Sequence, residues 1–135
     1  MHYVCTDYAV AMLRAARSGE DFTCYVDRNV ALPMIHIDDC IDGIIQFMSC
    51  ERTLLKRSVY NIHGVSLSPK ELHQAIEKVS RTRLVVNYEC DYRNDIAKSW
   101  PDRLDDANAQ RDWGWSPKHN LESIVRDMLR DIGED

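Results

Sequence analysis

His36 and Asp38 could act as a histidine–carboxylate pair, because alternation along an extended segment would place both side chains on one face. Such a pair can position a proton for transfer or supply two ligands to a metal ion. No third ligand lies nearby in the sequence, and the remaining histidines are scattered along the chain. We therefore interpret His36 as a packing residue and predict no metal site.

Nucleophilic catalysis has no support in the sequence, which contains no G-x-S-x-G motif and no local cysteine–histidine arrangement. The five cysteines are an odd number without a C-x-x-C pair, and three of them lie in apolar runs. This pattern predicts reduced, mostly buried thiols in an intracellular protein, with a disulfide framework as the less favoured alternative.

The composition limits the class of protein. The chain has 135 residues, which fits one domain, and its 44% hydrophobic and 29% charged residues are typical of a folded protein. A net charge of -5 without a polybasic run argues against a nucleic-acid partner. No apolar stretch is long enough for a membrane span, and the N-terminus carries no readable secretory signal.

Helix signals are clearest at residues 68–71, where a serine, a proline and a glutamate form a capping box. Asn120 is predicted to cap a last helix with a strong apolar stripe. Another helix should start at Asp38 or Asp39 and bury the face formed by Ile41, Ile44, Ile45 and Met48. Further helices are expected from Thr6 or Asp7 to Ser18 and over 104–113, with a short helical turn in 91–99.

Four β-prone runs alternate with these helices, at residues 22–26, 33–37, 58–62 and 83–88. The chain is therefore predicted to be an α/β protein with about five helices and three or four short strands. These strands are too short and too few for a complete doubly wound sheet.

Seven segments, in matching order and spacing, resemble the short-chain type of L-threonine 3-dehydrogenase, in the extended short-chain dehydrogenase/reductase and NAD-dependent epimerase/dehydratase superfamily. They are residues 6–10 (TDYAV), 33–39 (PMIHIDD), 60–62 (YNI), 66–69 (SLSP), 96–101 (IAKSWP), 104–106 (LDD) and 112–115 (DWGW). The resemblance implies that residues 1–135 form a single partial domain. This domain would be the helix-rich, C-terminal, substrate-binding portion of an enzyme that oxidises L-threonine to 2-amino-3-ketobutyrate with NAD.

Hydride transfer in this superfamily needs a glycine-rich loop for the cofactor and a tyrosine base followed four residues later by lysine. The five glycines are too far apart for the loop motif, and no tyrosine has a lysine at that spacing. We therefore expect no catalytic residue and no cofactor-binding residue in this chain, and no NAD bound by the chain alone.

The resemblance implies substrate-binding roles for Thr6, Asp7 and Trp100. Thr6 and Asp7 could hold the hydroxyl or ammonium group of threonine, although a helix cap is the simpler interpretation of the same pair. Trp100 could form a wall of the pocket or serve as a packed anchor, while Trp113 and Trp115 are interpreted as packing residues.

The leading hypothesis is thus a fragment or truncated form of the dehydrogenase that is inactive alone. Its expected partners are L-threonine in the intact enzyme and either a second copy or the missing Rossmann half, which would leave an apolar surface uncovered. One alternative is a non-catalytic interaction protein that pairs with complete subunits, and another is part of a nucleotide-sugar epimerase or dehydratase. The compartment is expected to be cytoplasmic or mitochondrial.

Overall fold

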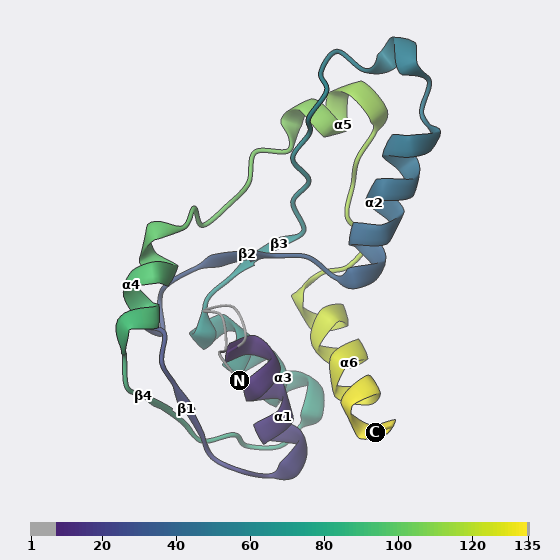
Figure 1. Ribbon diagram of the computed structural model, residues 1–135. Helices are drawn as coiled ribbons and strands as arrows, with labels where there is room; N and C mark the ends of the chain where they lie inside the picture. Colours follow the sequence, from purple (N-terminus) through teal and green to yellow (C-terminus); the bar gives the residue numbers. More distant parts are fainter. Residues whose placement is uncertain (1–7, 135) are drawn as a thin grey trace.

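A computed structural model describes residues 8–134 and shows an elongated molecule with a helical end and a narrower arm (Figure 1). At the helical end, α3 (Pro69–Ser80) packs against α1 (Tyr8–Ser18) and α6 (Leu121–Asp131). The arm contains α2 (Ile37–Ser49), the short 3₁₀ helix η2 (Arg52–Leu54) and α5 (Ala107–Trp113). The helix α4 (Tyr92–Ser99) lies at the side, and the 3₁₀ helix η3 (Ile132–Glu134) follows α6.

Two small sheets join these helices. β1 (Phe22–Cys24) pairs in parallel with β4 (Val86–Tyr88), and β2 (Leu32–Met34) pairs antiparallel with β3 (Val65–Leu67). The strands are shorter than the runs that predicted them, but the α/β, helix-rich class without a complete doubly wound sheet is confirmed. None of the described helices combines the length and the apolar character needed to cross a lipid bilayer.

The core lies at the helical end and is formed by the inward faces of α1, α3 and α6 together with both sheets. Its fully buried side chains include Met12, Leu13, Leu72, Ile76 and Val125. Burial of such side chains contributes about 1.5–3 kcal/mol each, so this end supplies most of the hydrophobic stabilisation.

Several helix boundaries confirm the sequence signals. Ser68 and Glu71 form the reciprocal capping box of α3, and Asn120 accepts a hydrogen bond from the Ser123 backbone N–H at 3.0 Å. The α5 helix ends at Gly114, whose φ of 75° lies in the left-handed region that glycine adopts without strain. The helix caps expected at Thr6 and Asp7 lie outside the described residues.

The start of α2 differs from the prediction. β2 ends at Met34, and the helix begins at Ile37 with His36 as its N-cap, so Asp38 and Asp39 lie within the first turn instead of capping it. The imidazole of His36 accepts the hydrogen bond from the Asp38 backbone N–H that a serine or aspartate would otherwise accept.

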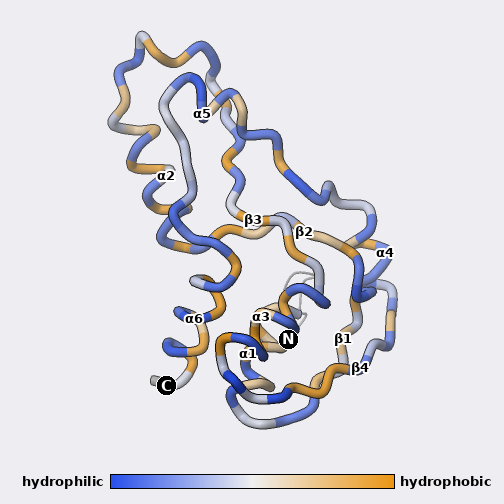
Figure 2. The backbone as a smooth tube through the Cα atoms, turned by 180° about the vertical axis from the view of Figure 1, so that it is seen from behind, coloured by the Kyte–Doolittle hydropathy of each residue, from blue (hydrophilic) through white to orange (hydrophobic). Residues whose placement is uncertain are grey.

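The predicted burial of the α2 apolar face is wrong. Hydrophobic residues recur along α2 (Figure 2). Their side chains are exposed, by 47–79% for Ile41, Ile44, Ile45 and Met48 and by 65% for Ile37. The helix instead packs through Gly43, where an added Cβ would lie 2.8 Å from the Trp115 ring. Periodicity identified the apolar face correctly, but nothing among the described residues covers that face.

The strand predicted at 58–62 is also wrong, because this segment pairs with none of the strands that the structure describes. Val59 is 78% exposed, whereas Tyr60 packs edge-on against Phe47 of α2 and Trp113 of α5. The prediction of mostly buried thiols fails as well, since only Cys24 is buried among the four described free cysteines.

Candidate functional site

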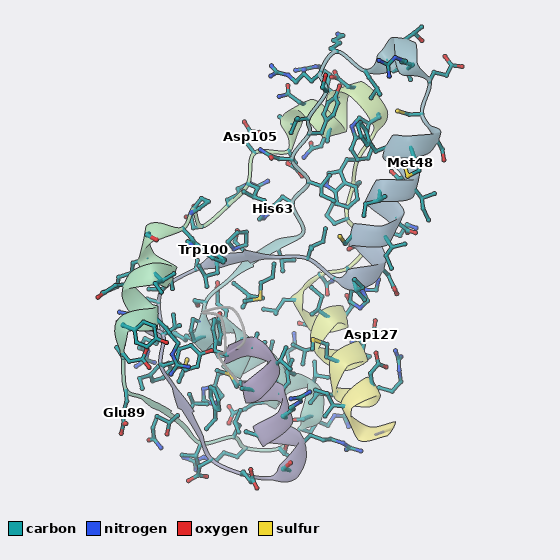
Figure 3. The ribbon with its side chains drawn as sticks, in the orientation of Figure 1. Met48, His63, Glu89, Trp100, Asp105 and Asp127 are labelled. Carbon is teal, nitrogen blue, oxygen red and sulfur yellow. The ribbon has the colours of Figure 1, made fainter. Side chains whose placement is uncertain are left out.

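One of the three residues predicted to contact substrate, Trp100, lies in the part of the chain that the structure describes. Thr6 and Asp7 lie outside the described residues. Trp100 is the C-cap residue of α4, its side chain is 40% exposed, and Figure 3 places it beyond the C-terminal end of that helix. A tryptophan exposed to this extent is available for contact with a ligand or another chain, and the prediction that it lines a substrate pocket remains a prediction.

The environments of Tyr8 and Tyr60 show whether either phenol could act as a proton acceptor. Tyr8 is fully buried, its hydroxyl has no partner among the described residues, and burial together with neighbouring Cys24 and Glu71 raises its pKa. The Tyr60 hydroxyl donates to the Asp112 carboxylate at 2.7 Å, and loss of solvent together with this hydrogen bond raises its pKa. Both phenols therefore stay protonated at neutral pH and are unsuited to act as general bases.

His63 and Ser66 are brought together by the turn before β3, as a serine and a histidine would be in a hydrolase. The His63 Nε2 atom lies 3.3 Å from the Ser66 hydroxyl, which donates to the Asp102 carbonyl at 2.6 Å. The Nδ1 atom accepts the Leu104 N–H at 3.4 Å, and burial lowers the His63 pKa. With its hydroxyl proton held by a carbonyl, Ser66 is not activated, so the pair ties residues 63–66 to 102–104.

The aromatic residues at the end of α5 hold the arm together. Trp115 is 2% exposed and its indole N–H donates to the His63 carbonyl at 3.3 Å. Trp113 contacts Phe47 and Tyr60, so the packing role predicted for both tryptophans is confirmed.

Asp39 joins α2 to the loop before α6. Its carboxylate is 2% exposed and accepts the backbone N–H groups of Lys118 and His119 at 2.9 and 3.0 Å. Asp38 and Asp39 lie in the first turn of α2, where their negative charge is favourable, although His36 and not an aspartate caps the helix. We call these two long-range hydrogen bonds the Asp39 clamp, and no pattern in the sequence indicated them.

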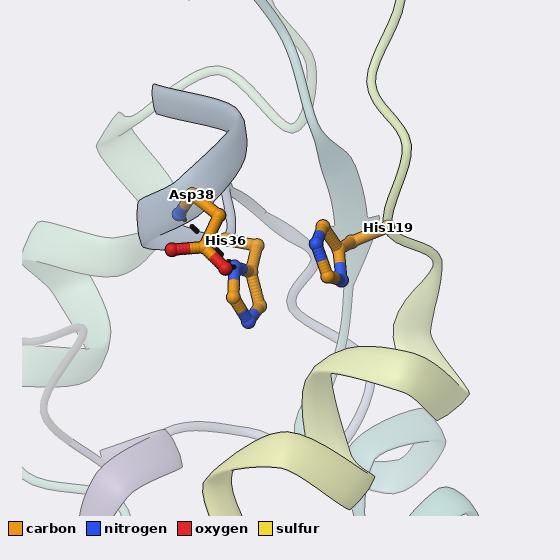
Figure 4. Close-up of side chains that lie close together, drawn as sticks. All are labelled: His36, Asp38 and His119. Carbon is orange, nitrogen blue, oxygen red and sulfur yellow. Dashed lines mark hydrogen bonds and ion pairs between the residues drawn. The ribbon is translucent and has the colours of Figure 1, made fainter. Parts of the chain in front are cut away.

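The same clamp brings His119 against His36 (Figure 4). The two imidazole rings stack with centroids 3.8 Å apart and an angle of 6° between their planes. Asp38 lies beside them, and Asp127 of α6 approaches His36 Nε2 at 3.4 Å and His119 Nδ1 at 3.7 Å. No third side chain that could bind a metal ion lies near His36 and Asp38 in the sequence, whereas the tertiary structure places His119 beside them.

The sequence of the chain is similar to those of several known proteins. No protein-family model matches it. It is 40% identical to an uncharacterized epimerase/dehydratase from Staphylococcus epidermidis, over 94% of this chain and 40% of the relative. It is 37% identical to the mitochondrial L-threonine 3-dehydrogenase from Bos taurus, over 96% of this chain and 35% of that enzyme.

Solved structures agree with these relatives. The GalE-like L-threonine dehydrogenase from Cupriavidus necator, in its holo form, matches with a TM-score of 0.91 and 39% identity, covering 97% of this chain and 42% of that chain. The L-threonine 3-dehydrogenase from Trypanosoma brucei matches with a TM-score of 0.92 and 38% identity, over 96% and 40% of the two chains. The chain thus spans about two fifths of the length of the relatives it matches.

Proposed function

The chain belongs to the family of L-threonine 3-dehydrogenases and epimerase/dehydratases, whose C-terminal portion it matches, and we propose that it is the substrate-side portion of an NAD-dependent L-threonine 3-dehydrogenase. In the proposal, the intact enzyme oxidises L-threonine to 2-amino-3-ketobutyrate. Thr6, Asp7 and Trp100 form part of the substrate pocket. The 135-residue chain neither binds NAD nor transfers hydride alone.

The uncovered apolar face of α2 carries the proposal. Ile37, Ile41, Ile44, Ile45 and Met48 are exposed on one side of the helix, and the extended segment 58–62 has no partner strand among the described residues. A nucleotide-binding half built from alternating strands and helices could supply both an apolar cover for the helix and a strand for the segment.

The chemistry of the side chains also indicates that another part of the enzyme binds the cofactor and accepts the proton. The sequence has no glycine-rich loop and no tyrosine followed four residues later by lysine. Tyr8 and Tyr60 are held in their protonated forms. The cofactor cradle and the proton acceptor would therefore come from residues that this sequence does not contain.

Calorimetric titration of the purified chain with NAD tests the cofactor part of the proposal. We expect no heat of binding up to millimolar cofactor, because no backbone loop here can approach a pyrophosphate. Saturable binding of NAD, or oxidation of threonine by the chain alone, would overturn it.

Co-expression with the nucleotide-binding half of a relative, such as the Bos taurus enzyme, tests the pairing. We expect a stable complex that reduces NAD in the presence of threonine. The double variant Ile44→Lys, Met48→Lys should abolish the complex, because it places two charges on the apolar face. Val85→Lys is a matched control, since Val85 is also apolar and exposed, at 44%, but lies near the start of β4.

Two alternatives have distinct outcomes in the same experiment. A non-catalytic interaction protein would bind complete dehydrogenase subunits without restoring activity to a nucleotide-binding half. The 40% identity with an epimerase/dehydratase favours the second alternative, a nucleotide-sugar enzyme. A reconstituted complex of that kind would convert nucleotide sugars and leave threonine unchanged.

A further inference from the structure

We propose that His36, His119 and Asp38 form a binding site for a divalent transition-metal ion such as Zn²⁺, where the start of α2 meets the loop before α6 (Figure 4). One donor atom from each of the three side chains lies within 4.8 Å of the other two. Two imidazole nitrogens and a carboxylate oxygen are a ligand set that zinc accepts, with water in the fourth position.

The backbone that carries the two histidines is fixed before any ion arrives. The buried Asp39 carboxylate holds the N–H groups of residues 118 and 119, which sets the position of His119 against α2. The backbone of His36 is fixed at the start of the same helix, in the N-cap position. Binding therefore requires side-chain rotation and no rearrangement of the chain, which lowers its entropic cost.

Asp127 selects the nitrogens that would face the ion. Its carboxylate lies 3.4 Å from Nε2 of His36 and 3.7 Å from Nδ1 of His119, which are ion-pair distances, and it would accept the N–H of each ring once the imidazoles turn toward it. A carboxylate that accepts the outer N–H of a ligating histidine fixes its tautomer and raises its basicity. The free lone pairs are then those of His36 Nδ1 and His119 Nε2, with Asp38 as the third donor.

Binding requires two local changes. Nearly parallel stacked rings direct their lone pairs side by side, so the imidazoles must tilt until the lone pairs converge. The Nδ1 atom of His36 must also release the Asp38 N–H, which it accepts at 3.1 Å. A groove of about 410 Å³, whose lining includes His36, Asp38 and Asp127 but not His119, leaves room for the His36 ring to turn, and the Asp38 side chain is 69% exposed.

Titration of the full chain with Co²⁺, followed by visible absorption and by displacement with Zn²⁺, tests the site. We expect one ion per chain and the visible absorption band of Co²⁺ held by nitrogen and oxygen ligands. His119→Gln and His36→Asn should each weaken binding about tenfold or more, while the asparagine keeps an N-cap oxygen for α2. Asp42→Asn removes a neighbouring carboxylate outside the ligand set and should change affinity by no more than about twofold.

Absence of the absorption band up to millimolar Co²⁺ would overturn the proposal, as would unchanged affinity in both histidine variants. If either histidine variant fails to fold by circular dichroism, Asp38→Asn decides the matter, because its side chain is exposed and its loss should leave the fold intact. A tenfold weaker affinity in that variant supports the site, and unchanged affinity overturns the assignment of the third ligand.

Discussion

Asp39 is a single side chain that joins two segments lying far apart in the sequence. Its carboxylate accepts two backbone N–H groups, is 2% exposed, and lies in the first turn of α2, where negative charge is favourable. The neighbouring Asp42 is more exposed and forms an ion pair with Lys118 at 2.6 Å. The two aspartates therefore provide a matched pair in the same helix.

We predict that Asp39→Asn lowers the free energy of unfolding by about 1–3 kcal/mol, because one of the two part-buried N–H groups of residues 118 and 119 loses its charged acceptor. Asp42→Asn should lower it by less than about 1 kcal/mol, since exposed ion pairs are screened by solvent. Urea titration of both variants measures the difference. Equal effects would show that the Asp39 clamp adds nothing beyond surface charge.

The contact between Tyr60 and Asp112 predicts a pH dependence. The hydrogen bond from Tyr60 lowers the pKa of the Asp112 carboxyl, so the contact contributes stability that is present above the unfolded pKa of the carboxyl, about 4, and is lost as the pH falls through the folded pKa. Tyr60→Phe should therefore lower the urea midpoint at neutral pH. The gap to the original protein should narrow below about pH 4, and a gap that stays constant would contradict the assignment.

The contact between His36 and His119 marks a limit of sequence reasoning at the residue scale. The sequence led us to interpret His36 as a packing residue, and the ring it packs against, that of His119, comes from a loop beyond α5. Local patterns carry no information about such contacts, because these depend on how the arm folds back on itself.

At the scale of elements, the helix ends were predicted best because their signals are local. The capping box of α3 is contained in residues 68–71. The Ser68 hydroxyl accepts the Glu71 N–H at 3.3 Å, and the Glu71 carboxylate accepts the Ser68 N–H at 2.8 Å. The strand predicted at 58–62 failed because a strand also needs a partner, and no described strand pairs with it.

We predict that Ser68→Ala lowers the free energy of unfolding by about 0.5–2 kcal/mol, because the Ser68 hydroxyl no longer accepts the Glu71 N–H or donates to the Glu71 carboxylate, while the backbone N–H of residue 68 keeps its acceptor. Ser58→Ala is the control, since Ser58 is exposed and lies outside any helix or strand, and it should change stability by less than about 0.5 kcal/mol. Thermal unfolding of both variants provides the comparison, and similar melting temperatures would contradict the role of the cap.

Among residues 8–134, a well-formed core at the helical end contrasts with an apolar face of α2 that none of these residues covers. The core lies among α1, α3 and α6, whereas α2, with its own hydrophobic residues, lies in the arm outside that group of helices (Figure 2). The sequence could identify both apolar stripes but could not distinguish them, because periodicity does not reveal what lies opposite a helix. Only the three-dimensional structure shows that the apolar stripe of α2 is exposed, by 79% at Met48 and 55% at Ile45, while the stripes of the core helices are buried.

An uncovered face of this kind should make the chain self-associate, because contact between two such faces removes apolar surface from water. We predict that Ile44→Lys combined with Met48→Lys lowers the weight-average sedimentation coefficient at high protein concentration. The same variant should change the free energy of unfolding by less than about 0.5 kcal/mol, since both side chains are already exposed. Leu72→Ala, at a position 2% exposed in the core, should instead cost about 2–5 kcal/mol without reducing association. If the lysine variant unfolds as readily as the core variant, α2 is buried in solution and its face is not free to bind a partner.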